Sequence, residues 1–481
     1  MKLQPEFSKQ IRENIDLICD FMGNSSDFVV REITIGRNQA ALFYLDGMVD
    51  LQKVQDSVIR PLHEFTFSDS NELSLPFLKN SILDVGEASL VQNYEDALDQ
   101  ILSGGLLLLI DGMGEGLVVS IPGWEERSIT ESKTQPVIRG PQESFTENLR
   151  TNTTMVRRRV KDTRVRLTNV KVGEKTKTDI SVMYMHGVAD DELVRNVISR
   201  LKNMKVDRVL EGEYLEECLV ENKQLTIFPI FYNSDRPDSI AAGVMEGKIA
   251  IFIDGTPFVI LAPAVFVDFI QSAEDYYQSF IYSSIIRVLR YISLAICLLA
   301  PAIYVALTTF HQNMIPTVLL LSLSAQREGV PFPAFVEAMI MEIIFEILRE
   351  AGLRMPRTVG QAVSIVGSIV IGQAAVEANI VSPVMVIVVA ITAISSFVIP
   401  SYTMAIPIRI LRFAFIGMAA MFGVYGLTVG ILILLVHLNS LHSFGVPYMS
   451  PVANFQSSKQ SDALLRFPFK NKANHHNKPR E

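Results

Sequence analysis

The last two fifths of the chain contain four long stretches without a charged residue. They are Tyr291–Phe310, Val359–Val376, Ser382–Ile408 and Phe413–Val436, with 20, 18, 27 and 24 residues. A helix needs about 20 apolar residues to cross a bilayer, so each stretch is a candidate span. A buried core helix has a similar composition, but four such stretches in succession are typical of a membrane protein. The pattern predicts an all-α, multi-span domain.

The earlier part of the chain alternates apolar and polar segments in a pattern that occurs twice. An apolar stretch around Tyr44 that ends in a glycine turn has a counterpart around Tyr184, 140 residues later. Two apolar runs flank Asp111-Gly112, and two similar runs flank Asp254-Gly255, 143 residues later. Asp-Gly between apolar runs is a strong hairpin signal. The nearly equal shifts predict two tandem α/β modules.

These patterns divide the chain into a soluble, tandem-repeat α/β N-terminal domain and an all-α transmembrane domain. The predicted boundaries are 1–24 for an N-terminal helical segment, 25–125 for the first module, 126–159 for a linker, 160–270 for the second module, 287–440 for the transmembrane helices and 441–481 for a polar tail. A basic run at the end of the linker, Arg157–Lys161, either pairs with acidic patches of a neighbouring subunit or is solvated.

Charge is unevenly distributed along the chain. Residues 1–280 contain 29 basic and 43 acidic residues, whereas residues 281–481 contain 14 and 8. An acidic N-terminal half argues against nucleic-acid binding, which requires a basic surface. Arg287 and Arg290 directly precede the first uncharged stretch, and positive residues at that place favour the cytoplasmic side. We therefore expect the N-terminal half to be cytoplasmic.

The sequence leaves the membrane topology after the first predicted span undecided. Arg409 and Arg412 favour the cytoplasmic side, and so does the basic tail, yet only one uncharged stretch separates them. The segment from Thr317 to Arg349 offers an additional crossing or a re-entrant turn. A cytoplasmic tail is the favoured arrangement.

The stretch Val359–Val376 is rich in small and polar residues and is the candidate pore lining. At helical spacing one face collects Gln361, Ser364, Ser368, Ile371 and Ala375, and Glu377 follows at the end of the stretch. A ring of such helices would provide a narrow, partly polar lining, and repeated Glu377 would form an acidic ring suited to cations. The alternative is that small residues only allow close helix packing.

A second candidate is the segment Phe335–Arg354. Its carboxylates Glu342, Glu346 and Glu350 recur every four residues and form one stripe, with Arg349 within pairing distance of Glu346. The stripe is either a vestibule that concentrates cations at a pore mouth or a solvated face paired with Arg349.

Catalytic chemistry is not indicated. The run Gly112–Gly116 lacks the Lys-Ser/Thr of a phosphate-binding loop, so it predicts a hairpin turn. The histidines are scattered, and three distant cysteines, Cys19, Cys218 and Cys297, form neither a disulfide framework nor a metal knuckle. We expect no enzyme activity, no cofactor and no metal site.

Several motifs in order along the chain carry a resemblance to a known family. They include Ile138-Arg139-Gly140-Pro141, Asp235-Arg236-Pro237-Asp238, Val330-Pro331-Phe332-Pro333, Arg349–Pro356, Gly372–Asn379 and Ser443–Tyr448. Together they resemble the A subunits of GerA-type spore germinant receptors. A related membrane protein of the same family, from a sporulation operon, shares much of the pattern.

The resemblance implies a function that composition does not. Such A subunits lie in the spore inner membrane with a transporter-like, nutrient-binding B subunit and a C-subunit lipoprotein. They are thought to form homo-oligomers that conduct monovalent cations when germination starts. Two other readings are a non-conducting scaffold and a secondary transporter, although the spans show no inverted repeat of similar length.

Overall fold

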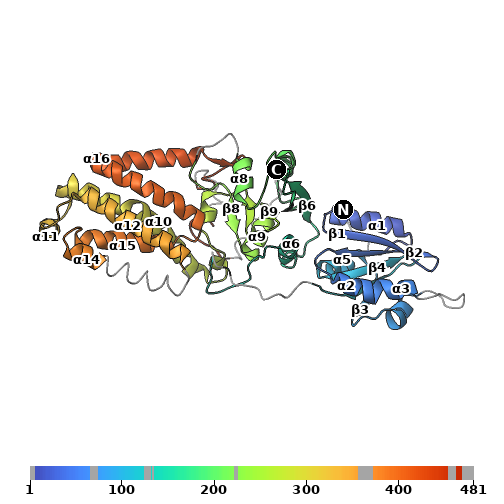
Figure 1. Ribbon diagram of the computed structural model, residues 1–481. Coiled ribbons are helices and arrows are strands. Elements are labelled where there is room, and N and C mark those ends of the chain that lie inside the picture. Colours follow the sequence, from blue (N-terminus) through green and yellow to red (C-terminus); the bar gives the residue numbers. More distant parts are fainter. Residues whose placement is uncertain are drawn as a thin grey trace. The chain divides into compact units, whose positions relative to one another are not determined.

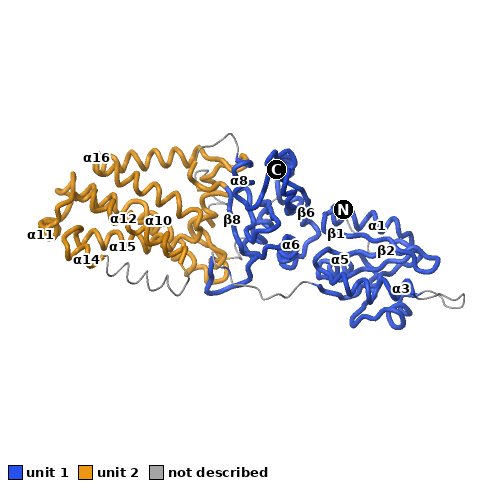
Figure 2. The backbone as a smooth tube through the Cα atoms, viewed as in Figure 1, with its two compact units in different colours: residues 1–222, 231–263 blue, residues 223–230, 264–481 orange. Residues whose placement is uncertain are grey.

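The computed structural model describes most of the chain as two separate units. The described residues are 6–64, 74–123, 132, 135–220, 226–355, 372–452 and 462–468. Unit 1 contains residues 1–222 and 231–263, and unit 2 contains residues 223–230 and 264–481 (Figure 2). Unit 1 holds two β-sheets, and unit 2 is mainly helical (Figure 1).

The first module of unit 1 is a five-stranded antiparallel sheet of order β1-β2-β4-β5-β3. The strands are β1 (Phe28–Ile35), β2 (Asn38–Leu45), β3 (Ala88–Val91), β4 (Gly105–Ile110) and β5 (Gly116–Ser120). One face packs on α1 (Ile11–Met22) and α5 (Tyr94–Leu102). The other face packs on a helical segment of α2 (Leu51–Lys53), a π-helix (Val54–Ile59) and α3 (Arg60–Glu64), and on α4 (Leu75–Phe77) with a second π-helix (Leu78–Ile82).

The central strand β4 shows why this sheet is buried on both faces. Leu106 and Leu108 belong to the core under the π-helical segment, and Leu107 and Leu109 belong to the core under α1 and α5. Because successive side chains of a strand point to opposite faces, an uninterrupted apolar run supplies both cores.

The second module repeats this arrangement with the order β6-β7-β9-β10-β8. Its strands are β6 (Val165–Val172), β7 (Thr178–Met185), β8 (Tyr232–Ser234), β9 (Ile249–Ile253) and β10 (Val259–Ala262), and its helices are α6 (Leu149–Arg157), α7 (Asp191–Asn203), α8 (Glu213–Leu219) and α9 (Pro237–Met245). The helix α6 lies in the range predicted as linker, yet Met155 and Val156 belong to the core of this module. It precedes β6 as α1 precedes β1.

Corresponding hydrogen bonds show that the repeat extends beyond the strand order. The Asp111 carboxylate accepts the backbone N–H of Ile11 at the start of α1, and the Asp254 carboxylate accepts that of Leu149 at the start of α6. Both Asp-Gly pairs form the predicted hairpin turns, with positive φ at Gly112 and Gly255. Each aspartate thus joins a hairpin to the first helix of its own module.

A buried ion pair connects the modules. The Nε and Nη2 atoms of Arg157 donate to the two carboxylate oxygens of Asp27 at 2.7 and 2.9 Å, and both side chains are buried. Ser25 donates to Asp27 and accepts the backbone N–H of Leu167 in β6. The predicted alternatives for this arginine are therefore wrong, since it is neither solvated nor offered to another subunit.

Replacing Asp27 with asparagine should weaken unit 1 strongly. The substitution leaves Arg157 buried without a carboxylate, a change that typically costs about 3–5 kcal/mol. We expect urea denaturation of a fragment of residues 1–263 to show a loss of this size. The matched control is Asp207→Asn, which removes an exposed pair with Lys175 and should cost less than about 1 kcal/mol. Equal losses for both variants would contradict the role given to the buried pair.

Unit 2 is a helical bundle. Its helices are α10 (Phe280–Thr309), α11 (Thr317–Arg327), α12 (Ala334–Arg354), α14 (Gly372–Glu377), α15 (Pro383–Phe397) and α16 (Tyr402–Ser440), and it also contains a small hairpin of β11 (His442–Ser443) and β12 (Val446–Pro447). By length and composition alone, α10 and α16 are the described helices that are apolar enough to cross a membrane. We call the end of the bundle where α10 begins the base and the end where α10 finishes the tip.

Helix α16 is two helices that reverse direction at Gly423, where φ is 61° and ψ is −140°. A Cβ atom built on Gly430 would lie 2.9 Å from the Phe415 ring, whereas in a straight helix these residues would be about 22 Å apart. A Cβ on Gly423 would meet Phe310 and His311, directly after α10. The turn therefore lies at the tip, and both ends of α16 lie toward the base.

Two predicted spans are corrected by this geometry. The stretch Ser382–Ile408 is divided between α15 and α16, because Pro400 in the intervening turn cannot donate a backbone hydrogen bond and disfavours helix in the residue before it. The stretch Phe413–Val436 passes along the bundle twice. This reversal removes the conflict in the predicted topology, because Arg409 and the segment after Ser440 lie on the same side of the turn.

The predicted polar tail begins with packed structure at the base. Ser443 donates to the carbonyl of Ile230 and accepts the N–H of Ala264, and the Tyr448 carbonyl accepts the N–H of Phe266. Ser443 and Tyr448 are fully buried. The chain thus enters and leaves the helical bundle at one end.

The tight contact inside α16 should not tolerate a larger residue. A Cβ on Gly426 would lie 2.4 Å from the backbone carbonyl oxygen of Met418, so alanine must push the two arms apart, at a cost of about 1–3 kcal/mol. We expect Gly426→Ala to lower the apparent melting temperature of the purified protein in detergent. Gly417 has open space around its Cβ position, so Gly417→Ala is the control and should melt like the wild type.

Candidate functional site

The first two carboxylates of the acidic stripe of α12, Glu342 and Glu346, face the first arm of α16 rather than bulk solvent. Nη1 of Arg412 donates to Oε2 of Glu342 at 2.5 Å, and both side chains are completely buried. One turn further along α12, Oε2 of Glu346 accepts Nη1 of Arg409 at 2.7 Å. Its other carboxylate oxygen lies 3.9 Å from Nη2 of Arg412.

The remaining charges of this region lie toward the base. Glu350 forms an exposed pair with Arg354 on α12 itself. The guanidinium of Arg349 lies over the rings of Phe397 and Tyr402, at 5.6 and 6.0 Å from their centroids. Glu346 takes Arg409 as its ion-pair partner, although Arg349 is one turn away on its own helix. The prediction of a solvated stripe paired with Arg349 is therefore wrong for Glu342 and Glu346.

A buried carboxylate also marks the tip. Glu337 is fully buried, and its two oxygens accept Arg327 at 3.1 Å and the backbone N–H of Ser382 at 2.9 Å. The contact joins the end of α11 to the start of α15. Since Glu337 lies at the tip and Arg349 lies beside the start of α16, α12 runs from the tip to the base.

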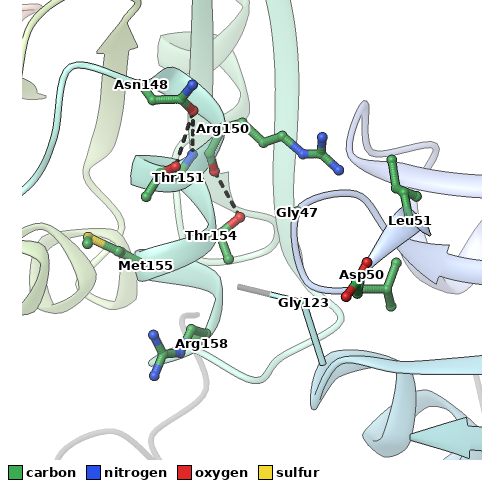
Figure 3. Close-up of a pocket in the computed structure, with 11 residues that line it drawn as sticks. Gly47, Asp50, Leu51, Gly123, Asn148, Arg150, Thr151, Thr154, Met155 and Arg158 are labelled. Atoms are coloured by element: carbon green, nitrogen blue, oxygen red, sulfur yellow. Dashed lines mark hydrogen bonds between the residues drawn. The ribbon is translucent and has the colours of Figure 1, made fainter. Parts of the chain in front are cut away.

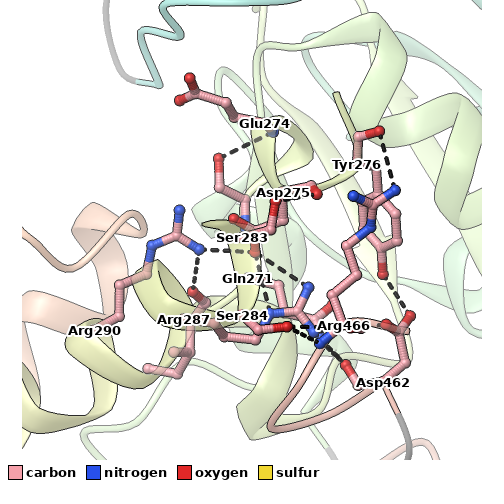
Figure 4. Close-up of polar contacts among 12 residues, drawn as sticks. Gln271, Glu274, Asp275, Tyr276, Ser283, Ser284, Arg287, Arg290, Asp462 and Arg466 are labelled. Carbon is pink, nitrogen blue, oxygen red and sulfur yellow. Dashed lines mark hydrogen bonds and ion pairs between the residues drawn. The ribbon is translucent and has the colours of Figure 1, made fainter. Parts of the chain in front are cut away.

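At the base, a polar network connects α10 to the segment of residues 462–468 (Figure 4). Asp275 is buried and accepts Arg287 at 3.2 Å and Arg290 at 2.8 Å. Arg287 also contacts Asp462, whose carboxylate accepts the Tyr276 hydroxyl at 2.7 Å. Arg287 and Arg290, which precede the first predicted span, are buried and paired. That they lie on the cytoplasmic side stays a prediction.

A pocket of about 410 Å³ lies in unit 1 between the first module and α6 (Figure 3). Asp50 and Leu51 lie on one side, and Asn148, Thr151 and Thr154 of α6 lie on the other. Asp50 caps α2 by accepting two backbone N–H groups, and Asn148 caps α6. The polar groups are thus committed to the fold, and the pocket is a seam between packed elements.

Some of the predicted pore residues lie in the described part of the chain and others do not. Gln361, Ser364, Ser368 and Ile371 lie outside the described residues, so their role stays a prediction. Ala375 is buried in α14, whereas Glu377 is exposed and accepts a hydrogen bond from Gln373. Asn379, just after α14, lies beside Gly329 before α12, so α14 is at the tip. No cluster of ligands for a metal ion occurs among the residues that the structure describes.

Residues 16–478 match the family described as Bacillus/Clostridium GerA spore germination protein. The chain belongs to the GerA family. It is 47% identical to spore germination protein KA of Bacillus subtilis over 97% of this chain and 85% of that protein. It is 42% identical to the uncharacterized membrane protein YfkQ of Bacillus subtilis over 96% of this chain and 90% of that protein.

A solved structure also matches the GerA chain. It is the crystal structure of the N-terminal domain of the A subunit of the Bacillus megaterium spore germinant receptor GerK3, with 35% identity over 55% of this chain and 99% of that one, and a TM-score of 0.41. The family prediction from the ordered motifs is confirmed by the match over nearly the whole chain. The basic partners of the acidic stripe were missed, because they lie 63 and 70 residues away in sequence.

Glu216 of unit 1 is a carboxyl group with a strongly raised pKa. Burial raises the pKa of Glu216 on α8 to about 7, against a hydrogen bond from Asn233 that lowers it. A raised carboxyl pKa adds stability below the unfolded pKa, near 4.5, and that stability is lost as the pH rises toward 7.

Replacing Glu216 with glutamine should therefore flatten the pH profile of unit 1. Between pH 4.5 and 7.5 the wild-type fragment should lose roughly 3 kcal/mol relative to the variant, since each pKa unit is worth about 1.4 kcal/mol. Urea denaturation across this range measures the difference. Glu217→Gln, at an exposed position of the same helix, is the control and should keep the wild-type profile. Parallel profiles for Glu216→Gln and the wild type would exclude this assignment.

Proposed function

We propose that this GerA protein is the A subunit of a nutrient germinant receptor in the spore inner membrane. The family match supports a role in spore germination, and the ordered motifs favour the A subunit. The partners we propose are a transporter-like, nutrient-binding B subunit and a lipoprotein C subunit. The fold of unit 1 and the buried charges of unit 2 both fit a protein that transmits a change rather than catalysing a reaction.

The bundle of unit 2 is proposed to cross the membrane several times. The passages among the described residues are α10, α12, α15 and the two arms of α16, and we propose the predicted span Val359–Val376 as a further one. The observation that carries this proposal is that the chain enters at Phe280 and leaves at Ser440 on the same side, the base. An even number of passages follows from it. The N-terminal unit and the C-terminal segment then share one side of the membrane, which we propose is the spore core.

Several copies are proposed to surround a cation pore. Helix α12 ends at the base with Arg354, and α14 lies at the tip. The candidate pore stretch with Ser364 and Ser368 falls between them in the sequence. A small-residue stretch of this length is suited to line a narrow path. At the tip, exposed Glu377 of each copy would contribute to an acidic ring that attracts cations.

Bulky residues in this stretch should alter ion release. We expect Ser364→Phe or Ser368→Phe to reduce the nutrient-triggered release of monovalent cations from spores by about tenfold or more, because a narrowed apolar constriction excludes water and ions. Ion-selective electrodes measure the release, and immunoblots check that the subunit accumulates. The control is Val436→Phe, at an exposed position of α16. Wild-type release by an accumulated Ser364→Phe protein would rule out the pore assignment.

A further inference from the structure

The charges buried between α12 and α16 are not explained by a pore lined by the small-residue stretch. We propose that Arg412 is a latch that masks the acidic stripe of α12, and that conduction requires Glu342 and Glu346 to leave this guanidinium and meet the ion path. The proposal rests on the proposed cation pore and names how that pore is kept shut.

The geometry gives Arg412 a position between two carboxylates. Glu342 and Glu346 are one turn apart on α12, and the two helices run in opposite directions, so Arg412 and Arg409 meet them in reverse order. Arg412 bonds Glu342 at 2.5 Å and lies 3.9 Å from Glu346. The contacts form an alternating ladder of carboxylates and guanidinium groups across one helix interface.

This ladder is incompletely bonded. Oε1 of Glu342, Oε1 of Glu346, and the Nε and Nη2 atoms of Arg412 are buried and have no hydrogen-bond partner among the described residues. A buried ion pair is on average no better for stability than apolar residues of similar size, and unsatisfied polar atoms add a further cost. A contact that served only to stabilise the bundle would be better made by apolar side chains.

The same contact suits an interface that changes between a dry and a hydrated state. In a dry interface, separating Arg412 from Glu342 leaves two unpaired buried charges, which is strongly unfavourable. If the interface opens to an aqueous path, water and cations compensate both charges and most of that cost disappears. The pair therefore favours a closed, dry interface and an open, wet one over any intermediate.

All three carboxylates of the predicted stripe form ion pairs with arginine, but these pairs differ in burial. Glu350 and Arg354 are exposed, so their pair can open at little cost. Glu342 and Arg412 are fully buried. The buried pair is the proposed latch, and the exposed pair on α12 provides a matched control.

The test uses spores that carry the complete receptor. Arg412→Lys keeps the charge but loses the forked geometry that reaches both carboxylates. We expect it to raise the release of potassium from dormant spores, without nutrient, by about tenfold, the population shift produced by a loss of about 1.4 kcal/mol. Arg354→Lys makes the same replacement in an exposed pair of α12, so it is the control and should release potassium at the wild-type rate. Immunoblots verify accumulation of each protein.

A second variant distinguishes a leak caused by loss of the ion pair from one caused by misfolding. Glu342→Gln removes the same contact from the other side, so the double variant Arg412→Lys/Glu342→Gln should release potassium within about twofold of Arg412→Lys alone, because both substitutions break one interaction. Unchanged release by an accumulated Arg412→Lys protein, or leaks that multiply in the double variant as independent defects would, overturns the latch. Adding Ser364→Phe to Arg412→Lys separates the two ideas. A leak that persists in this variant contradicts the pore lining while supporting the latch.

Discussion

A charge that is removed from water must be compensated, and this constraint organises the helical unit. Arg412 has no exposed surface, so the carboxylates of α12 must lie against it. This pairing fixes the lengthwise register between α12 and the first arm of α16. The register in turn places Arg349 against the ring of Tyr402 at the base and Glu337 against the start of α15 at the tip.

The reversal at Gly423 makes that arrangement compatible with the ends of the bundle. A continuous helix of 39 residues would be about 58 Å long, almost twice the thickness of a bilayer core. With the turn at the tip, the second arm returns to the base, where Ser443 and Tyr448 are buried beside residues 230, 264 and 266. The polar network around Asp275 lies at the same end and holds residues 462–468 against α10. Changes at the base can thus reach α10 and α16 together.

Unit 1 is held together by a different arrangement. Each module has a sheet buried on both faces, and the Arg157–Asp27 pair joins the modules through one fully enclosed contact.

Local signals in the sequence predicted local structure well. The Asp-Gly turns became hairpins because their geometry depends on two adjacent residues, and the near-equal shifts became two sheets of the same order. Nonlocal features could not be predicted in this way. The spacing of Glu342 and Glu346 predicts a shared face, but not that arginines from another helix would bury it. The role of Asp111 at the start of α1 was hidden because its partner is 100 residues away.

Two of the sequence predictions were wrong for the same reason. Gly423 lies in a stretch without charged residues or proline, so nothing in the composition distinguishes its turn from a continuous helix. The basic run of the linker reads as solvated because charge usually means exposure. In both places the deciding contact is tertiary: the Phe310–His311 corner beside Gly423, and Asp27 beside Arg157.

The most direct test of the account is cryo-electron microscopy of the intact receptor in a lipid bilayer. The account predicts several copies of this chain around a central axis, with residues 359–376 facing that axis and Arg412 against Glu342 in the resting state. A single copy in the complex, or a small-residue stretch that faces only lipid, would contradict the central claim that this subunit forms the path for ions.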